Sequence, residues 1–254
     1  MELAKTPSLR LDGKRALISG AGRGIGLAAA TALADAGAQV TLVSRTAAEI
    51  DAAADALVAA GAQAEALVLD LTDIAAMEAA VGKAGPFDIL INNAGTNRPK
   101  LMAETTLDDF DAIVGLNLRA AYFIDRAVTN GMIAAGRPGS ILHISSQMGH
   151  VGGPKRTVYC ASKFAIEGLT KAMAIEFAPH NIRVNSIGPT FIDTPLARVS
   201  LEDPEMKAYI MSKIKLGRIG RVEDLMGAIV FLSSDAAAMI TGAALLIDGG
   251  WTVG

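Results

Sequence analysis

The stretch RALISGAGRGIGLAAATALADAGAQVTLVS, residues 15–44, decides the fold. A short apolar run is followed by a glycine-rich turn, an alanine-rich segment of strong helix formers and a second apolar run. This order is typical of a βαβ unit, in which a crossover helix joins two parallel strands. Because both apolar runs are nearly continuously hydrophobic and do not alternate with polar residues, we expect strands buried on both faces of a parallel sheet.

The same alternation continues along the chain. Alanine-rich segments separate the further apolar runs EALVLD, DILINN, SILHIS, IRVNSI and ALLIDGG. The pattern predicts an α/β fold with a doubly wound parallel sheet. Two segments depart from it. Residues 105–135 predict one short and one long helix, with Asn117 in a helical context, and residues 190–220 form an insertion of the kind that serves as a substrate lid.

Composition narrows the class of protein. The 254 residues show no point of division, so we expect a short extension, residues 1–10, and one domain, residues 11–254. A formal charge of −3 with scattered cations does not favour nucleic acid as a partner. The single cysteine, Cys160, excludes an intrachain disulfide, leaves no zinc-ligand cluster and fits a cytoplasmic location. No signal peptide or membrane-spanning run is expected, and no metal.

The glycine-rich turn SGAGRGIG, residues 19–26, predicts a pyrophosphate site. Gly20, Gly24 and Gly26 allow a sharp turn and a close approach of the backbone to a phosphate, and the helix that follows offers unpaired N–H groups. A glycine trio alone also fits a plain tight turn. Its place at the start of a βαβ unit favours dinucleotide binding.

The end of the second strand indicates which dinucleotide is bound. A carboxylate there would hold the ribose 2′-hydroxyl of NAD(H), whereas a cation would bind the 2′-phosphate of NADP(H). The chain has Ser44 and Arg45 at this point, and Arg23 lies in the glycine turn. Guanidinium groups suit a phosphate ligand, so NADP(H) is favoured over NAD(H). The alternative is that both arginines are ordinary surface residues.

The segment YCASK, residues 159–163, predicts an acid/base pair. Tyr159 and Lys163 are four residues apart and share one helical face. A phenol with an ordinary pKa of about 10 is a poor base at neutral pH, and a nearby ammonium favours the phenolate. Either Ser145 or Ser146 could donate a hydrogen bond to the substrate oxygen. Asn117 predicts a local irregularity in its helix, because asparagine competes for backbone hydrogen bonds.

Five ordered motifs, SGAGRGIG, NNAG at 92–95, Asn117 within GLNLR, Ser146 and YCASK, resemble the short-chain dehydrogenase/reductase family. The resemblance extends from about residue 11 to the C-terminus. It implies a single Rossmann-like domain with a seven-stranded parallel sheet. It also implies that Tyr159 is the general acid/base, Lys163 its activator, Ser146 the hydroxyl that orients the substrate and Asn117 the anchor of a proton-relay water.

The resemblance implies further roles. Asp70 would contact the adenine and Leu71 would contribute its backbone. Thr190 follows Pro189 where the family usually has glycine, and Ser19 stands where threonine is commoner. The remaining implied cofactor contacts are Ile25, Asn93, Ala94, Gly95, Pro189, Ile192 and Thr194, in addition to Tyr159 and Lys163 themselves. A homotetramer built through the long helices and the segment LLIDGGWTVG, residues 245–254, is implied as well.

The loop between Ser146 and Tyr159 is the candidate substrate-selecting segment. Gln147, His150, Lys155 and Arg156 lie in it and favour a polar, hydroxylated or anionic substrate. The alternative is a solvated loop without a role, and His143 and His180 are interpreted as structural.

We therefore expect an NADP(H)-preferring oxidoreductase that interconverts a secondary alcohol and a ketone of the sugar, polyol or sugar-acid type. The alternatives are a 3-oxoacyl thioester reductase and a non-catalytic nucleotide-sensing protein. The complete set of Asn117, Ser146, Tyr159 and Lys163 argues against the latter.

Overall fold

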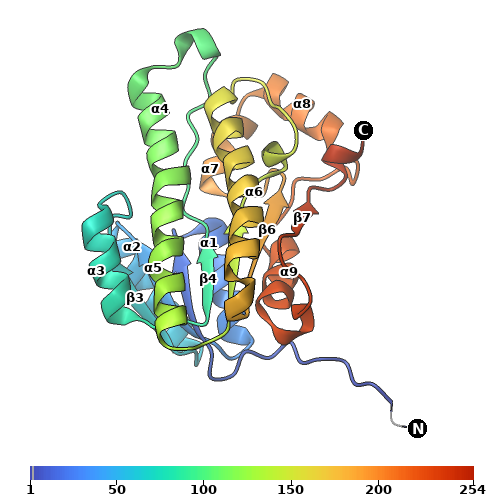
Figure 1. The fold of residues 1–254 in the computed structure, drawn as a ribbon. Helices are drawn as coiled ribbons and strands as arrows, with labels where there is room; N and C mark the ends of the chain where they lie inside the picture. The colour runs from blue at the N-terminus through green and yellow to red at the C-terminus, as the bar shows by residue number, and fades with distance from the viewer. Residues whose placement is uncertain (2) are drawn as a thin grey trace.

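One parallel sheet forms the centre of the molecule. The computed structural model describes residue 1 and residues 3–254. Within that part the strand order is β3-β2-β1-β4-β5-β6-β7 (Figure 1). The strands are β1 (Arg15–Ser19), β2 (Gln39–Ser44), β3 (Ala64–Val68), β4 (Ile89–Asn92), β5 (Gly139–Ile144), β6 (Ile182–Pro189) and β7 (Ala244–Ile247). Each coincides with a predicted apolar run, so the expected doubly wound parallel sheet is confirmed.

The inner strands are buried on both faces, as their continuous hydrophobicity predicts. Successive side chains of a strand point to opposite faces of the sheet. In β1, Ala16 and Ile18 therefore pack into one core cluster, whereas Leu17 packs into a second cluster on the other face. All three side chains are fully buried. The sheet thus needs a layer of helices on each side.

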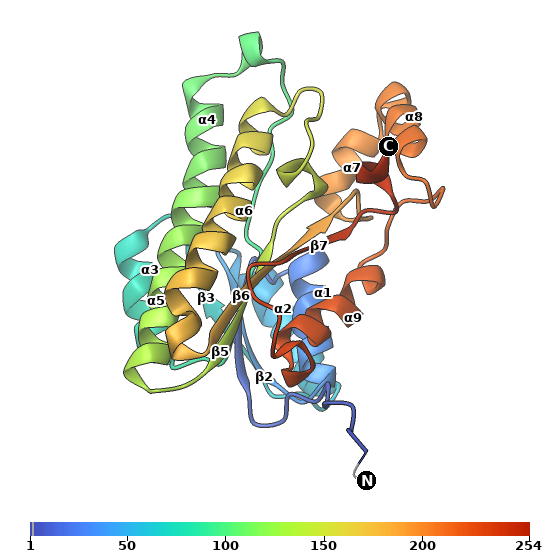
Figure 2. The same cartoon turned by 45° about the vertical axis from the view of Figure 1, so that its right-hand side comes forward.

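Helices cover both faces of the sheet (Figure 2). One face packs against α1 (Gly24–Asp35), α2 (Ala47–Ala59) and α9 (Glu223–Ser233). The other packs against α3 (Ile74–Ala84), α5 (Ala121–Ala134) and α6 (Thr157–Phe177). The short α4 (Leu107–Val114) precedes α5, as the sequence predicts. None of the described helices is long and apolar enough to cross a membrane.

The strand order places the functional loops. The chain runs outward from β1 through β2 to β3, and then returns to β4 on the other side of β1. At such a reversal the loops after the two central strands diverge, which opens a crevice at the carboxyl ends of the strands. The glycine turn follows β1 and the NNAG segment follows β4, so both lie at this crevice.

Two short helices, α7 (Pro195–Leu201) and α8 (Pro204–Lys213), occupy the insertion after β6. Each starts with an N-cap side chain, Thr194 or Asp203, followed by proline at the first helical position. A small separate cluster holds them against the C-terminal segment. Trp251 stacks on Phe191 with ring centroids 5.8 Å apart and meets Tyr209 edge-on at 5.9 Å. Figure 2 shows the C-terminus beside α7 and α8.

His143 lies in the core, in agreement with its structural interpretation. Its Nε2 is 2.9 Å from Asp125 Oδ2 and its Nδ1 is 2.7 Å from Thr170 Oγ1. Asn92 donates a hydrogen bond of 2.9 Å to the other oxygen of Asp125. This buried network joins β4 and β5 to the helices α5 and α6. His180 is exposed after α6.

Candidate active site

The glycine turn has the geometry of a phosphate cradle. Gly20 and Gly24 have φ values of 64° and 59°, a region that favours glycine. A Cβ atom at Gly26 would overlap the carbonyl oxygen of Gly20 and lie 2.6 Å from Asn93 Nδ2. Helix α1 begins at Gly24, and no side chain caps its first turn. The free N–H groups at this terminus can therefore bind an anion, and the residues present fit a dinucleotide pyrophosphate.

Hydrogen bonds lock the NNAG segment to the glycine turn. Ser19 Oγ accepts from the backbone nitrogens of Asn93 and Ala94, both at 2.9 Å. Asn93 Nδ2 donates to the carbonyl oxygens of Ser19 and Gly20 at 2.9 and 3.1 Å. The two loops thus form one rigid floor for a ligand at the crevice. Ser19 holds this floor through its hydroxyl group, which is the feature it shares with threonine.

Two arginines and one aspartate lie after the ends of β1, β2 and β3. Arg45 is exposed, and Arg23 Nη1 is 2.9 Å from Glu49 Oε1 at the surface. Asp70 accepts from the Thr72 backbone nitrogen at 2.9 Å and from its hydroxyl at 2.7 Å. These hydrogen bonds, with the charge of Arg45, hold the pKa of the Asp70 carboxyl below its ordinary value. The chain has Ser44, which is half-buried, and Arg45 at the end of β2, and the Glu49 carboxylate of α2 lies near Ser44 beside Gly22.

Helix α6 presents Tyr159 and Lys163 to the cavity together. Lys163 Nζ donates to the carbonyl oxygen of Ile144 at 2.8 Å and lies 5.7 Å from the centroid of the Tyr159 ring. Burial lowers the pKa of the Lys163 ammonium to about 8, against a smaller opposite effect from Glu167. Burial raises the pKa of the Tyr159 phenol, while a hydrogen bond with Ser146 and the charge of Arg156 lower it.

Ser146 begins the turn after β5, with its hydroxyl close to the phenol. Its Oγ donates to Gln147 Oε1 at 2.8 Å and accepts from the Met148 backbone nitrogen at 3.1 Å. Ser145 also lines the cavity, but its hydroxyl is buried without a hydrogen-bond partner in the described structure. Of the two serines, Ser146 is the one that lowers the pKa of the Tyr159 phenol.

Asn117 lies in a π-helical turn, Gly115–Ala120, between α4 and α5. The irregularity predicted from this asparagine is therefore present. Asn117 Oδ1 accepts from the Thr96 backbone nitrogen at 2.7 Å, and Nδ2 donates to the Thr96 carbonyl oxygen at 2.9 Å and to Ser162 Oγ at 3.2 Å. Ser162 in turn donates to the carbonyl oxygen of Tyr159 at 2.7 Å. Asn117 thus ties the segment after β4 to the helix that carries Tyr159.

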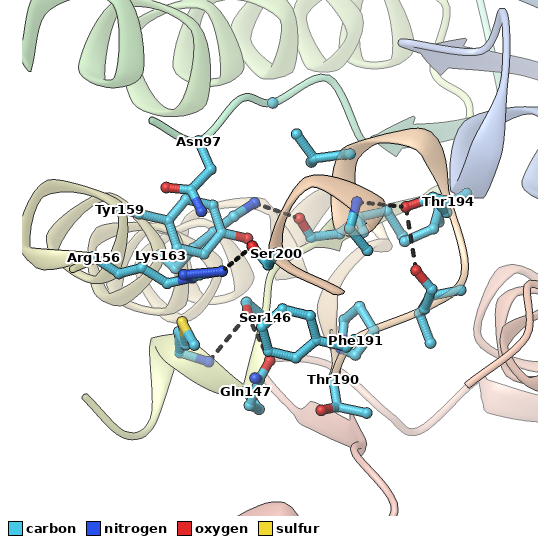
Figure 3. A pocket seen from close by; sticks show the side chains of 18 of the residues that line it. Asn97, Ser146, Gln147, Arg156, Tyr159, Lys163, Thr190, Phe191, Thr194 and Ser200 are labelled. Atoms are coloured by element: carbon cyan, nitrogen blue, oxygen red, sulfur yellow. Dashed lines mark hydrogen bonds between the residues drawn. The ribbon is translucent and has the colours of Figure 1, made fainter. Parts of the chain in front are cut away.

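These residues surround a cavity of about 190 Å³. Figure 3 shows Tyr159, Lys163 and Arg156 on one side of it and Thr194 on the other, with Ser200 of α7 beside Arg156. The predicted residues that line it are Ile25, Asn93, Gly95, Ser146, Gln147, Arg156, Tyr159, Lys163, Pro189, Ile192 and Thr194.

The remaining predicted cofactor residues, Gly20, Arg23, Gly24, Gly26, Ser44, Arg45, Asp70, Leu71 and Ala94, lie outside this cavity, at or after the ends of β1 to β4. Asn117 stands behind the cavity wall.

Comparisons with known proteins agree with this geometry. A family model described as enoyl-(acyl carrier protein) reductase matches residues 20–252. D-Erythrulose reductase of Gallus gallus is 42% identical over 247 residues, which cover 97% of this chain and 99% of that protein. Gluconate 5-dehydrogenase of Gluconobacter oxydans (strain 621H) is 39% identical and 96% of each chain is covered. A crystal structure of a gluconate 5-dehydrogenase from Burkholderia cenocepacia J2315, in complex with NADP and tartrate, superposes with a TM-score of 0.93 at 35% identity, covering 97% of this chain and 98% of that one.

The chain belongs to the short-chain dehydrogenase/reductase family. It is an NAD(P)-dependent oxidoreductase that acts on CH–OH groups, as D-erythrulose reductase and gluconate 5-dehydrogenase do. The predicted family, the single Rossmann-like domain and the class of reaction are confirmed.

Only part of the candidate substrate-selecting loop lines the cavity of this short-chain dehydrogenase/reductase. Gln147 and Arg156 line it, whereas His150 does not and lies 3.4 Å from Glu167 Oε1. Lys155 is exposed with a φ of 58°. The sequence indicates nothing that would separate these four residues, because the loop's path decides which of them faces inward.

Other cavity residues were not predicted. Three residues of α7, Leu196, Val199 and Ser200, line the cavity and follow the spacing of one helical face, which a search for short amphipathic helices would have found. Asn97 is the second residue after the NNAG motif, and Phe191 directly follows Pro189–Thr190. The remaining unpredicted lining residues are Thr96, Pro99, Ile144, Met148, Thr190 and Ala197, with Ser145 weighed but not chosen.

Proposed function

We propose that this enzyme interconverts a secondary alcohol and the corresponding ketone of a sugar, polyol or sugar acid, with NADP(H) preferred over NAD(H). The placement of Tyr159, Lys163 and Ser146 around one cavity next to the glycine turn carries the proposal. The names of its relatives support the substrate type, since they include reductases of a keto sugar and dehydrogenases of a sugar acid. The NADP in the related gluconate 5-dehydrogenase supports the choice of cofactor.

The cofactor supplies the nicotinamide carbon that accepts or gives up the hydride. In the oxidation direction, Tyr159 as phenolate removes the hydroxyl proton of the substrate, and in reduction the phenol returns it to the carbonyl oxygen. The Lys163 ammonium favours the phenolate because it lies 5.7 Å from the ring centroid and carries a positive charge at neutral pH. Ser146 donates a hydrogen bond to the substrate oxygen once its hydroxyl leaves Gln147.

We assign Asn117 to the proton path behind Tyr159. A π-helical turn leaves backbone carbonyl groups without their usual helical partners, and such groups are suited to hold water. The side chain of Asn117 keeps this turn in contact with Thr96 and with Ser162, which donates to the backbone carbonyl oxygen of Tyr159.

The test is Tyr159→Phe, with Tyr122→Phe on the exposed side of α5 as the matched control. We expect Tyr159→Phe to abolish oxidation and reduction followed at 340 nm while the affinity for NADP is retained, and Tyr122→Phe to remain active. Full activity of Tyr159→Phe would refute the mechanism. A panel of ketoses, polyols, sugar acids and a 3-oxoacyl thioester, with NADP and NAD in parallel, tests the substrate type. Turnover of the thioester alone would refute the sugar assignment.

We also propose a homotetramer. Large apolar side chains stand exposed on α4, on the long helices α5 and α6 and on the edge strand β7, among them Phe110, Tyr122, Phe164 and Leu245. Such side chains favour burial against a second copy of the chain. Light scattering coupled to size-exclusion chromatography tests the assembly, and a monomer at micromolar concentration would refute it.

Three further assignments belong to the same proposal. Residues 190–220 act as a substrate lid, residues 1–10 are an extension outside the catalytic domain 11–254, and the protein works in the cytoplasm. The position of α7 along the cavity supports the lid, and the exposure of residues 3–10 supports the extension. Cell fractionation tests the location.

A further inference from the structure

Arg156 is a buried cation at the cavity, and in the described structure it has no carboxylate partner. Its side chain is 5% exposed. Nη2 donates to Ser200 Oγ at 2.8 Å, and the guanidinium carbon lies 5.3 Å from the centroid of the Phe191 ring. Both contacts come from the segment after β6 that leads into and through α7. They fix the side chain in place, but neither of them neutralises its charge.

A lone buried charge is unfavourable. Removing an ion from water costs several kcal/mol unless an opposite charge and hydrogen bonds replace the lost solvation. Arginine does not escape this cost by losing its proton, because its guanidinium stays protonated in proteins. Burial lowers the pKa of Arg156, which reflects the same cost. The guanidinium also keeps donor groups beyond the one used by Ser200, so it is suited to bind an anion brought in by a ligand.

The position of Arg156 indicates which ligand carries the anion. Arg156 directly precedes α6 and Tyr159 follows three residues later, and both side chains line the same cavity (Figure 3). The cofactor phosphates are assigned to the glycine turn and to Arg23 and Arg45, at the ends of other strands. An anion at Arg156 therefore belongs to the molecule whose hydroxyl-bearing carbon faces Tyr159.

Within the part of the chain that the structure describes, the cavity also holds three buried polar atoms without hydrogen-bond partners, one of which is the Ser145 Oγ described above. Asn97 Oδ1 and Thr190 Oγ1 are buried without a partner in the described structure, and both residues line the cavity. Buried polar atoms are normally paired, so a ligand that donates hydrogen bonds fits here. Thr190 takes the place of a glycine that the family usually has, and it adds a hydroxyl to the cavity. Several substrate hydroxyl groups would pair these atoms.

We propose that Arg156 binds a substrate carboxylate, so that the enzyme prefers hydroxy and oxo acids of the sugar type over neutral polyols of the same carbon chain. This inference rests on the proposed function and narrows its substrate class. Asn97 and Thr190 bind hydroxyl groups of the same substrate, and Ser200 holds the guanidinium in place as the α7 segment packs over it.

The experiment compares a panel of aldonates, each with the alditol of the same configuration, for example gluconate with glucitol. Reactions with NADP are followed at 340 nm in the unmodified enzyme, Arg156→Met and Arg156→Lys. Arg126→Met is the matched control, because Arg126 is an exposed arginine of α5 that pairs with Glu78 and does not line the cavity. The measured quantity is kcat/KM for the acid divided by kcat/KM for the neutral substrate. Arg156 also lowers the pKa of the Tyr159 phenol, but this effect is common to both substrates and cancels in the ratio.

We expect the unmodified enzyme and Arg126→Met to prefer the acid. In Arg156→Met the kcat/KM ratio should fall by about 10- to 100-fold, mainly through KM, as expected for one lost charged hydrogen-bond pair. Arg156→Lys should recover part of the ratio. If Arg156→Met does not fold, the unmodified enzyme is tested with gluconate against uncharged gluconamide, and at least a tenfold preference for the acid is expected.

An unchanged kcat/KM ratio in Arg156→Met, or equal rates with gluconate and gluconamide, would overturn the role of Arg156. The proposed function would still stand in that case if the enzyme turns over neutral sugars or polyols. Turnover of neither sugar acids nor polyols, with activity only on a 3-oxoacyl thioester, would refute both.

Discussion

Lys163 is a buried cation whose charge costs stability, and replacing it with methionine measures that cost. The side chain is 6% exposed. Burial lowers its pKa from the ordinary value of 10.5 to about 8. At neutral pH the folded protein therefore holds the proton less tightly than the unfolded chain does. Since one pKa unit corresponds to about 1.36 kcal/mol, the depression costs the folded state about 3 kcal/mol.

The sign of the pH dependence follows from these two pKa values. Below pH 8 the lysine is protonated in both states, and the cost is present in full. Between pH 8 and 10.5 the unfolded chain binds the proton and the folded protein does not, so stability rises with pH. Methionine removes the charge and also the hydrogen bond to the Ile144 carbonyl oxygen, which costs about 1–3 kcal/mol at every pH.

The assay is urea unfolding of the cofactor-free protein between pH 7 and 10.5, for the unmodified chain, Lys163→Met and Lys171→Met. The last variant removes an exposed lysine from the same helix and serves as the control. We expect Lys163→Met to match or exceed the unmodified protein at pH 7, to fall behind it by pH 10.5, and to be inactive throughout. The difference in free energy of unfolding should change by about 3 kcal/mol across this range. A difference that stays constant with pH would refute the account of Lys163.

Three other predictions address the cofactor site and the core. Gly26→Ala should abolish NADP binding and lower the Tm, because the added Cβ would overlap the Gly20 carbonyl oxygen at a cost of about 1–3 kcal/mol or more. The control is Gly82→Ala, which has open space around it and should be neutral or slightly stabilising in the same thermal melts. Arg45→Asp should lower kcat/KM with NADP by about 10- to 100-fold and improve it with NAD; no change in the NADP/NAD ratio would mean that Arg45 does not contact the 2′-phosphate. Asp125→Ala leaves His143 and Asn92 without a buried hydrogen-bond partner, and the free energy of unfolding should fall by about 1–3 kcal/mol for each of them. An unchanged urea midpoint would contradict this.

The strands and the catalytic helix were predictable from the sequence because each depends on local pattern. A run such as QVTLVS is apolar on both faces and fits only a buried strand, and YCASK places Tyr159 and Lys163 together by helical spacing alone. Asn117 indicated an irregular turn because its side chain disfavours a regular helix.

The rest depends on contacts between distant segments. The strand order, with β4 beside β1, follows from the packing of the whole chain. His150 turned toward Glu167 and Arg156 toward Ser200, and neither partner is near in sequence. The cavity-lining face of α7 likewise depends on where the insertion packs.

The cluster around Trp251 has a practical consequence. Trp251 is the only tryptophan of the chain, and it is buried against Phe191 and Tyr209, which belong to the segment between β6 and the end of α8. Excitation near 295 nm would therefore report on this segment alone. Any displacement of α7 or α8 during ligand binding would alter the emission of a single fluorophore, so the movement that the proposed lid requires can be tested and timed in the unmodified enzyme, without a label.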